Sequence, residues 1–277
     1  MMFLNGFLIR IGKFTSFLAL DVLISLLANL TFFSLYWNEK IQPTLILFYL
    51  CSVWTLYLAD HLWDAYRERG EISERSRFYL QFRIYIICFL ILLGLTSLYV
   101  GMSFEFHFLL IHLPLLIAFG FFLLLIVIKR SPIPKEILVS LFYTLGVIAP
   151  FHSFGANEPM IWIFLIHVFA NVLLTYDADR EFDQSQKTFT LTKYWKPKTV
   201  QIMVQYLWGL GMISLLSLGF LENQSGDFLI GLGLAYIWLG VCSFQKRKGF
   251  GFKSLCELSY LPMFLPQIIF FFSLLPS

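Results

Sequence analysis

The sequence predicts an all-α polytopic membrane protein. Of the 277 residues, 58% are hydrophobic and 13% are charged, and the mean hydropathy is +0.76. A soluble globular domain has about 25% charged residues, so this chain lies far outside that class. Apolar runs of about 20 residues recur along the chain, and each is long enough to cross the hydrocarbon core as a helix.

Nine apolar runs are predicted to span the membrane. They cover residues 14–35, 42–63, 79–100, 106–128, 136–152, 159–178, 199–221, 227–244 and 254–275. The first run lacks a small-residue cleavage site, so we expect it to remain as an anchor rather than act as a cleaved signal peptide. No soluble domain or long linker separates the runs, which predicts one domain over residues 1–277.

The basic residues predict the orientation of the chain. All but one of the 20 Lys and Arg residues fall before the first run or after an even-numbered run, and the exception is Lys40. The loops on the cytoplasmic side of a membrane are those enriched in Lys and Arg. We therefore expect the N-terminus and these loops in the cytoplasm, the C-terminus outside, and a bacterial inner membrane as the location.

Two compositional features exclude other classes of function. The net charge of +3 is too small to indicate a nucleic-acid partner. The four cysteines show no CxxC or metal-binding spacing, so we interpret them as small apolar residues. They are Cys51, Cys88, Cys242 and Cys256.

The most informative stretch is Tyr176 to Asp183, which follows the apolar run from Ile161 to Thr175. It places acidic and basic groups at the mouth of a membrane helix, where ionisable side chains usually have a function. If the helix continues, Asp179 and Asp183 are i,i+4 neighbours on one face and both reach the same cation.

A second acidic set lies upstream at the end of another even-numbered run. Asp60, Asp64 and Glu68 are spaced by four residues, so they form a strip that turns only about 40° per step. Neighbouring carboxylates do not all stay ionised without a counter-charge. A magnesium ion supplies it, since Mg²⁺ prefers oxygen ligands and shares them with substrate phosphates. The alternative is that these are solvated helix ends paired with Arg67, Arg180 and Lys187.

These motifs resemble those of the UbiA superfamily of intramembrane prenyltransferases, which have nine transmembrane helices and two aspartate-rich motifs. The second motif of that family reads D-R-E-x-D, followed by a basic residue and Thr-Leu. Asp179 to Asp183 match it, with Lys187 and Thr188 behind and Phe189 in place of Leu. A third similarity is the basic-plus-proline loop that runs from Lys129 to Pro134, although Leu125 stands where the family usually has tyrosine.

The first motif of the family departs further from this sequence. It reads N-D-x-x-D-x-x-x-D, and only Asp64 is identical here. Asp60 stands for the Asn, His61 for the first Asp and Glu68 for the last Asp.

The resemblance implies nine helices around a central cavity and prenyl transfer from a polyprenyl diphosphate to a lipophilic or aromatic, quinone-precursor-like acceptor within membrane lipid. It implies Mg²⁺ as the cofactor and Asp64, Asp179 and Asp183 as the catalytic residues. The implied metal ligands are Asp60, Asp64, Glu68, Asp179 and Asp183. The implied diphosphate contacts are Lys129, Arg130, Arg180 and Lys187.

Three further residues are candidates for the substrate pocket: His61, Asn171 and Tyr176. His61 is either a metal ligand or base, or an interfacial polar group. Asn171 lies eight residues before Asp179 on a similar helical face, so it either lines the same cavity or makes an interhelical hydrogen bond.

Two alternative functions stay open. A terpene cyclase of the same superfamily would ionise a prenyl diphosphate without a second substrate. The chain could instead be a transporter or a non-enzymatic lipid-binding protein. Carboxylates near the bilayer midplane and helices broken there by Gly or Pro would favour a transporter.

Overall fold

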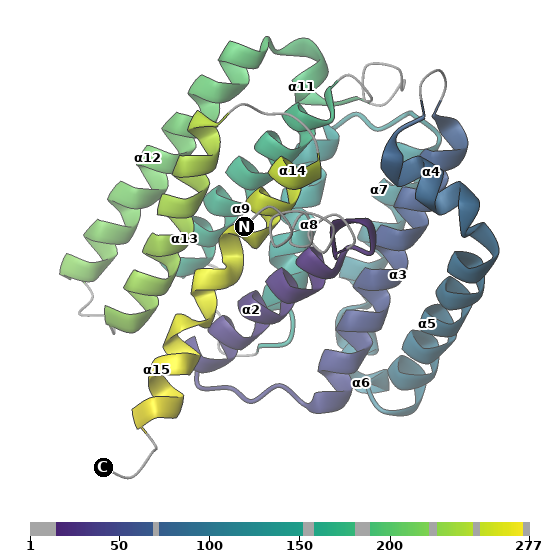
Figure 1. The fold of residues 1–277 in the computed structure, drawn as a ribbon. Coiled ribbons are helices and arrows are strands. Elements are labelled where there is room, and N and C mark those ends of the chain that lie inside the picture. The colour runs from purple at the N-terminus through teal and green to yellow at the C-terminus, as the bar shows by residue number, and fades with distance from the viewer. Residues whose placement is uncertain are drawn as a thin grey trace, which may run out of the picture. The chain divides into compact units, whose positions relative to one another are not determined.

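A computed structural model describes residues 15–68, 72–151, 158–180, 189–221, 226–245 and 250–273. Within these ranges every regular element is helical, which confirms the predicted all-α class (Figure 1). The side chains of Leu221 and Phe250 are not described.

Among the described residues, six helical segments are long and apolar enough to cross a membrane, so the chain is a multi-pass membrane protein. They are α3 (Pro43–Arg67), α5 (Arg83–Ser103), α9 (Pro159–Ala178), α12 (Pro197–Leu221), α13 (Gly226–Phe244) and the combined segment Gly251–Ser273. Two shorter apolar helices are α2 (Leu20–Tyr36) and α7 (Leu113–Val127).

The predicted count of nine spans is not confirmed, although each predicted run overlaps a helix. The run 159–178 coincides with α9 at both ends. The run 106–128 is divided into α6 (Phe106–Ile111) and α7, and the run 136–152 forms the 14-residue helix α8 (Lys135–Ile148). The run 254–275 is divided into α14 (Phe250–Glu257), the 3₁₀ helix η1 (Leu258–Phe264) and α15 (Leu265–Ser273).

The helices group into two compact units. Unit 1 comprises residues 1–23 and 41–113, and unit 2 comprises residues 24–40 and 114–277. The prediction of a single domain stays a prediction, and each unit is described by itself below.

Unit 1 is built on the pairing of α3 with α5. Pro43 opens α3, where its missing N–H costs nothing. Leu58, Leu62 and Ala65 recur at helical spacing and pack with Ile86 and Leu93 of α5. The short helix α4 (Glu74–Gln81) also packs against α3, and Ser73 caps it by accepting a hydrogen bond from the Ser76 backbone N–H at 3.2 Å.

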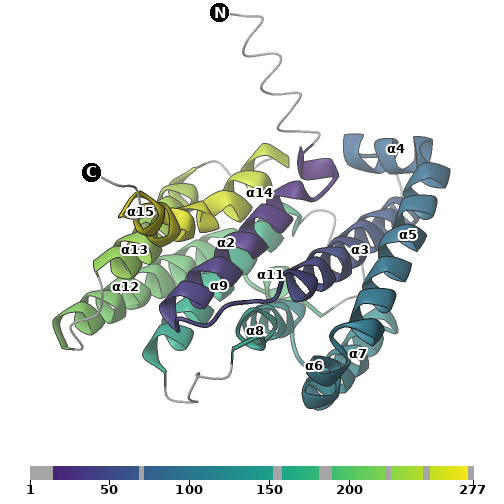
Figure 2. The same cartoon turned by 90° about the horizontal axis from the view of Figure 1, so that it is seen from below.

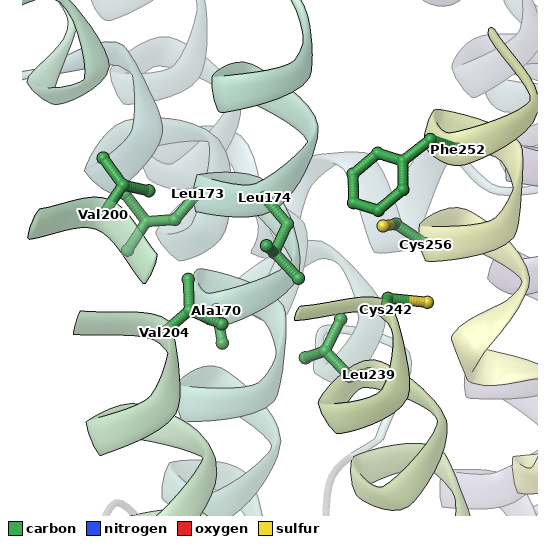
Figure 3. Packing of buried hydrophobic residues seen from close by; sticks show 9 residues of the cluster. All are labelled: Ala170, Leu173, Leu174, Val200, Val204, Leu239, Cys242, Phe252 and Cys256. Carbon is green, nitrogen blue, oxygen red and sulfur yellow. The ribbon is translucent and has the colours of Figure 1, made fainter. Parts of the chain in front are cut away.

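Unit 2 is organised around α9. In its most apolar window 61% of the residues are buried, more than in any other candidate span. Helices α8 and α12 pack directly against α9 (Figure 2). Figure 3 shows a buried hydrophobic cluster in which residues of α9, α12, α13 and α14 meet. They are Ala170, Leu173, Leu174, Val200, Val204, Leu239, Cys242, Phe252 and Cys256.

Two glycines let aromatic side chains cross between α12 and α13. A Cβ on Gly211 would lie 2.2 Å from the hydroxyl of Tyr236, which donates a hydrogen bond to the Ile163 carbonyl at 2.6 Å. A Cβ on Gly240 would lie 2.6 Å from Nε1 of Trp208, which donates to the Tyr236 carbonyl at 2.9 Å. Each helix therefore offers a glycine to an aromatic residue of the other.

The junction of α14 and η1 is held by three other helices. The Leu255 carbonyl accepts from Trp238 Nε1 at 3.0 Å, the Cys256 carbonyl from Asn171 Nδ2 at 2.6 Å, and the Glu257 carbonyl from Ser25 Oγ at 2.7 Å. Trp238 belongs to α13, Asn171 to α9 and Ser25 to α2. In a low-dielectric interior such partners stabilise carbonyls at a change of helix type.

Candidate functional site

The carboxyl end of α9 carries the described part of the strongest motif. The helix ends at Ala178, and Asp179 follows as its C-cap, with its backbone N–H 3.3 Å from the Thr175 carbonyl. Asp177, Asp179 and Arg180 thus stand at the mouth of a spanning helix, as the sequence predicts. Asp183 and Lys187 lie outside the described residues.

Asp177 and Arg180 form an internal ion pair. Arg180 Nε donates to Asp177 Oδ1 at 2.9 Å, and its Nη2 makes a second, short contact to the same oxygen. Its Nη1 donates to the Trp195 carbonyl at 2.5 Å. Only 3% of the Asp177 side chain is exposed. This pair joins the end of α9 to the residue after α11 (Leu191–Tyr194), so its first role is structural.

Asp179 has a different environment. Lys253 of α14 donates from Nζ to Asp179 Oδ2 at 2.8 Å. The side chains are 26% exposed for Lys253 and 30% for Asp179, so the protein encloses neither group fully. Asp177 and Asp179 are only two residues apart, yet the Asp177 side chain is buried and the Asp179 side chain is partly exposed.

The start of α8 adds a buried carboxylate beside this end. Glu136 is 0% exposed and accepts hydrogen bonds from the backbone N–H groups of Leu191 and Thr192, both at 3.0 Å. The hydroxyl of Thr192 donates to it as well, at 3.1 Å. Three donors compensate the cost of burying the carboxylate, and they hold α11 on the start of α8.

Tyr176, a predicted pocket residue, is half-buried near the end of α9 and contacts α8. The ammonium of Lys135 lies 5.4 Å from the centroid of its ring, a cation–π distance.

Lys129 and Arg130 end α7 in an exposed turn. Lys129 has φ 60°, its N–H bonds to the Ile126 carbonyl at 3.0 Å, and the Arg130 N–H bonds to the Leu125 carbonyl at 2.9 Å. This is a Schellman motif with lysine in the left-handed position. Both side chains are exposed, which suits the predicted contact with a phosphate.

The acidic strip of α3 lies in unit 1 and meets α4. Asp60 is exposed. Asp64 lies 3.9 Å from the guanidinium of Arg75, and Glu68 accepts from the backbone and the hydroxyl of Ser73, at 3.2 and 3.0 Å. The predicted alternative of solvated, paired helix ends therefore has support here, with Arg75 as the partner in place of Arg67. Arg67 lies over the ring of Trp63 instead, 4.4 Å from its centroid.

His61 takes part in a buried hydrogen-bond relay. Its Nδ1 lies 3.2 Å from the hydroxyl of Tyr79, which donates to the Phe17 carbonyl at 2.7 Å. Burial raises the pKa of Tyr79, so the phenol stays protonated and keeps this bond. His61 therefore ties α3 to α4 within unit 1.

Asn171 is buried, and its Nδ2 donates to the Cys256 carbonyl and to Ser259 Oγ, at 2.6 and 3.2 Å. The predicted alternative of an interhelical hydrogen bond is thus present. The metal ligands stay a prediction: in the described ranges, no group of three or more His, Cys, Asp or Glu residues is arranged to hold a metal ion.

A scan against protein-family models, a search of curated proteins and a search of solved structures each returned no match.

Sequence reasoning did not select Lys253, Glu136 or Arg75 as site residues. In the sequence Lys253 is one of several basic residues after an even-numbered run, and its partner Asp179 lies 74 residues away. The sequence does contain one signal for Glu136. This acidic residue follows Pro134 and Lys135 at the start of an apolar run, and a negative charge is stabilising at the N-terminus of a helix.

Proposed function

We propose that this protein is an intramembrane prenyltransferase that moves a prenyl group from a polyprenyl diphosphate to a lipophilic aromatic acceptor. The observation that carries the proposal is Asp179, an open carboxylate at the mouth of a spanning helix, already bonded to a cation. A water-accessible oxygen ligand beside basic residues suits a site for a metal-bound diphosphate.

The described residues at this end of unit 2 supply only some of the oxygen ligands that a magnesium site needs. Asp177 is bonded to Arg180 and almost fully buried, whereas Asp179 is bonded to Lys253 and is the more exposed of the two carboxylates. One or two carboxylates are what Mg²⁺ commonly takes from a protein when substrate phosphates and water complete its shell. Bound there with Asp183 as the second ligand, magnesium would neutralise charge on the diphosphate.

In the proposed reaction the bond between the allylic carbon and the diphosphate oxygen breaks, and the diphosphate leaves with the electron pair. The acceptor then bonds to the allylic carbon and loses a proton. Lys129 and Arg130 are exposed candidates for phosphate contact. Lys187, which lies outside the described residues, is a further candidate from the sequence. Arg180 would contribute while remaining bound to Asp177. Asp60, Asp64 and Glu68 are proposed as further carboxylates for metal, and there Arg75 and Ser73 already engage two of them.

The experiment uses purified full-length protein in lipid nanodiscs with magnesium and labelled farnesyl or geranylgeranyl diphosphate. Diphosphate release is measured with and without aromatic acceptors. We expect release that depends on an acceptor and falls about 100-fold or more in Asp179→Asn, because electrostatic stabilisation of the leaving group is lost.

Asp227→Asn is the matched control, since it removes one carboxylate from the first turn of α13 and should retain activity. Release without acceptor would indicate the cyclase instead. An inactive wild-type protein with every acceptor, or an active Asp179→Asn, would contradict the proposal.

A second candidate, a lipid-binding or transport protein, is favoured by one observation. The last candidate span changes from α14 to the 3₁₀ helix η1, which contains Pro262. Discontinuous helices of this kind often bind substrates in transporters. Uptake of labelled prenyl lipid into proteoliposomes, with no diphosphate release, would support this candidate.

A further inference from the structure

The pair formed by Asp179 and Lys253 is more exposed than the neighbouring pair formed by Asp177 and Arg180 at the end of α9. Lys253 Nζ lies 2.8 Å from Asp179 Oδ2, and about a quarter to a third of each side chain is exposed. The neighbouring pair of Asp177 and Arg180 has exposed fractions of only 3% and 12%. The first pair is thus only partly enclosed by protein, whereas the second is almost fully enclosed.

A divalent cation that bound to Asp179 would compete with Lys253, whose Nζ lies 2.8 Å from Oδ2 of that carboxylate. An ammonium and a metal ion are both cations that bind carboxylate oxygen, so they compete for the same atom. The lysine is a point charge on a flexible stem, and it can pair with a phosphate oxygen after it leaves the carboxylate. Its anchor on α14 keeps it close, because Phe252 and Cys256 of that helix pack against α9.

We propose that Lys253 is an exchangeable counter-ion, which neutralises Asp179 before the metal binds and then passes to an oxygen of the incoming diphosphate. This inference rests on the proposed function and adds a phosphate-binding residue to it. It implies opposite effects of Lys253 on two ligands: it weakens binding of the metal alone, and it strengthens binding of diphosphate in the presence of metal.

The test measures Mn²⁺ binding by electron paramagnetic resonance and pyrophosphate binding by calorimetry, with full-length protein in nanodiscs. In Lys253→Gln we expect Mn²⁺ alone to bind about two- to fivefold more tightly, because a partly exposed competitor is removed. Pyrophosphate with Mn²⁺ should bind about tenfold more weakly, because one charged hydrogen bond is lost. Lys253→Arg should retain pyrophosphate binding.

Lys198→Gln is the matched control, with the same change of charge at an exposed position at the start of α12. If Lys253→Gln and Lys198→Gln change both affinities equally, the effect is general surface charge and the inference is wrong. If Lys253→Gln does not fold, Lys253→Arg decides: a tenfold loss of pyrophosphate binding there overturns the inference. If the wild-type protein binds no pyrophosphate with Mn²⁺, the proposed function fails first.

Discussion

Tyr79 joins three segments of unit 1 through one hydroxyl group. It lies beside His61 of α3 and donates to the Phe17 carbonyl. The side chain is fully buried, so both contacts form away from water. At the scale of the residue, His61 and Tyr79 therefore act as a structural pair.

Tyr79→Phe should lower the free energy of unfolding by about 1–3 kcal/mol, because the Phe17 carbonyl and His61 lose their partner in a buried setting. The measurement is chemical unfolding in detergent. Tyr85→Phe, at a position that is 76% exposed, is the control and should leave the midpoint unchanged. Equal midpoints for the two variants would contradict the relay.

Gly211→Ala should destabilise unit 2 by about 2–4 kcal/mol, because the new methyl group overlaps Tyr236 and displaces its hydrogen bond. Gly209→Ala on the same helix meets no atom within 4 Å and should be neutral or slightly stabilising. Thermal unfolding of both variants distinguishes crowding from a general effect of alanine. A Gly211→Ala variant of unchanged stability would show that Tyr236 can bond to the Ile163 carbonyl in another side-chain conformation.

At the scale of the element, the last candidate span depends on other helices for its shape. Three consecutive carbonyls at the end of α14 accept side-chain donors from α13, α9 and α2. Pro262 lacks an N–H and lies inside η1. The change from α to 3₁₀ geometry is thus accompanied by tertiary hydrogen bonds as well as by the local sequence.

Asn171→Ala should lower the unfolding free energy by about 1–3 kcal/mol, since it removes both buried hydrogen bonds to the α14–η1 junction. Gln201→Ala is the matched control, because its amide makes only a 3.5 Å contact to the Ser243 carbonyl. Unfolding in sodium dodecyl sulfate measures both. A larger loss in Gln201→Ala would contradict the role given to Asn171.

Glu136→Gln tests how α8 holds α11. One carboxylate oxygen becomes an NH₂ group that faces a backbone N–H, so Leu191 or Thr192 loses its acceptor. We expect amide hydrogen exchange in this short segment to rise about tenfold or more. Glu74→Gln, at an exposed position on α4, should not change it. Unchanged exchange in Glu136→Gln would show that α11 is held by other contacts.

At the scale of the whole molecule, the chain is a multi-pass helical membrane protein whose orientation stays a prediction from its basic residues. Lys40 follows α2, and Lys196 immediately precedes α12. In a variant without native cysteines, Lys40→Cys should react with an impermeant maleimide in intact cells, and Lys196→Cys should react only after lysis. The reverse pattern would invert the orientation.

The sequence predicts the class of fold and the ends of α9, because residues 159–178 form one largely apolar run of membrane-spanning length. It predicts Asp179 and Arg180 at a helix mouth for the same reason. It does not predict Lys253, Glu136 or the donors to the α14–η1 junction as partners, because contacts across 17 to 232 residues depend on packing that no spacing rule encodes. Pro262 is visible in the sequence, but the 3₁₀ geometry around it depends on its neighbours as well.

Tyr236 packs on Gly211 and Trp208 packs on Gly240, so α12 and α13 contact each other at two reciprocal points. One contact alone would allow α12 and α13 to pivot about it. Two contacts in opposite directions oppose both sliding and rotation of one helix against the other. Tyr236 also bonds to α9, so the three helices are locked at one axial register. Any ligand-driven movement within unit 2 should therefore carry α9, α12 and α13 as one rigid body, with displacement confined to the elements around them.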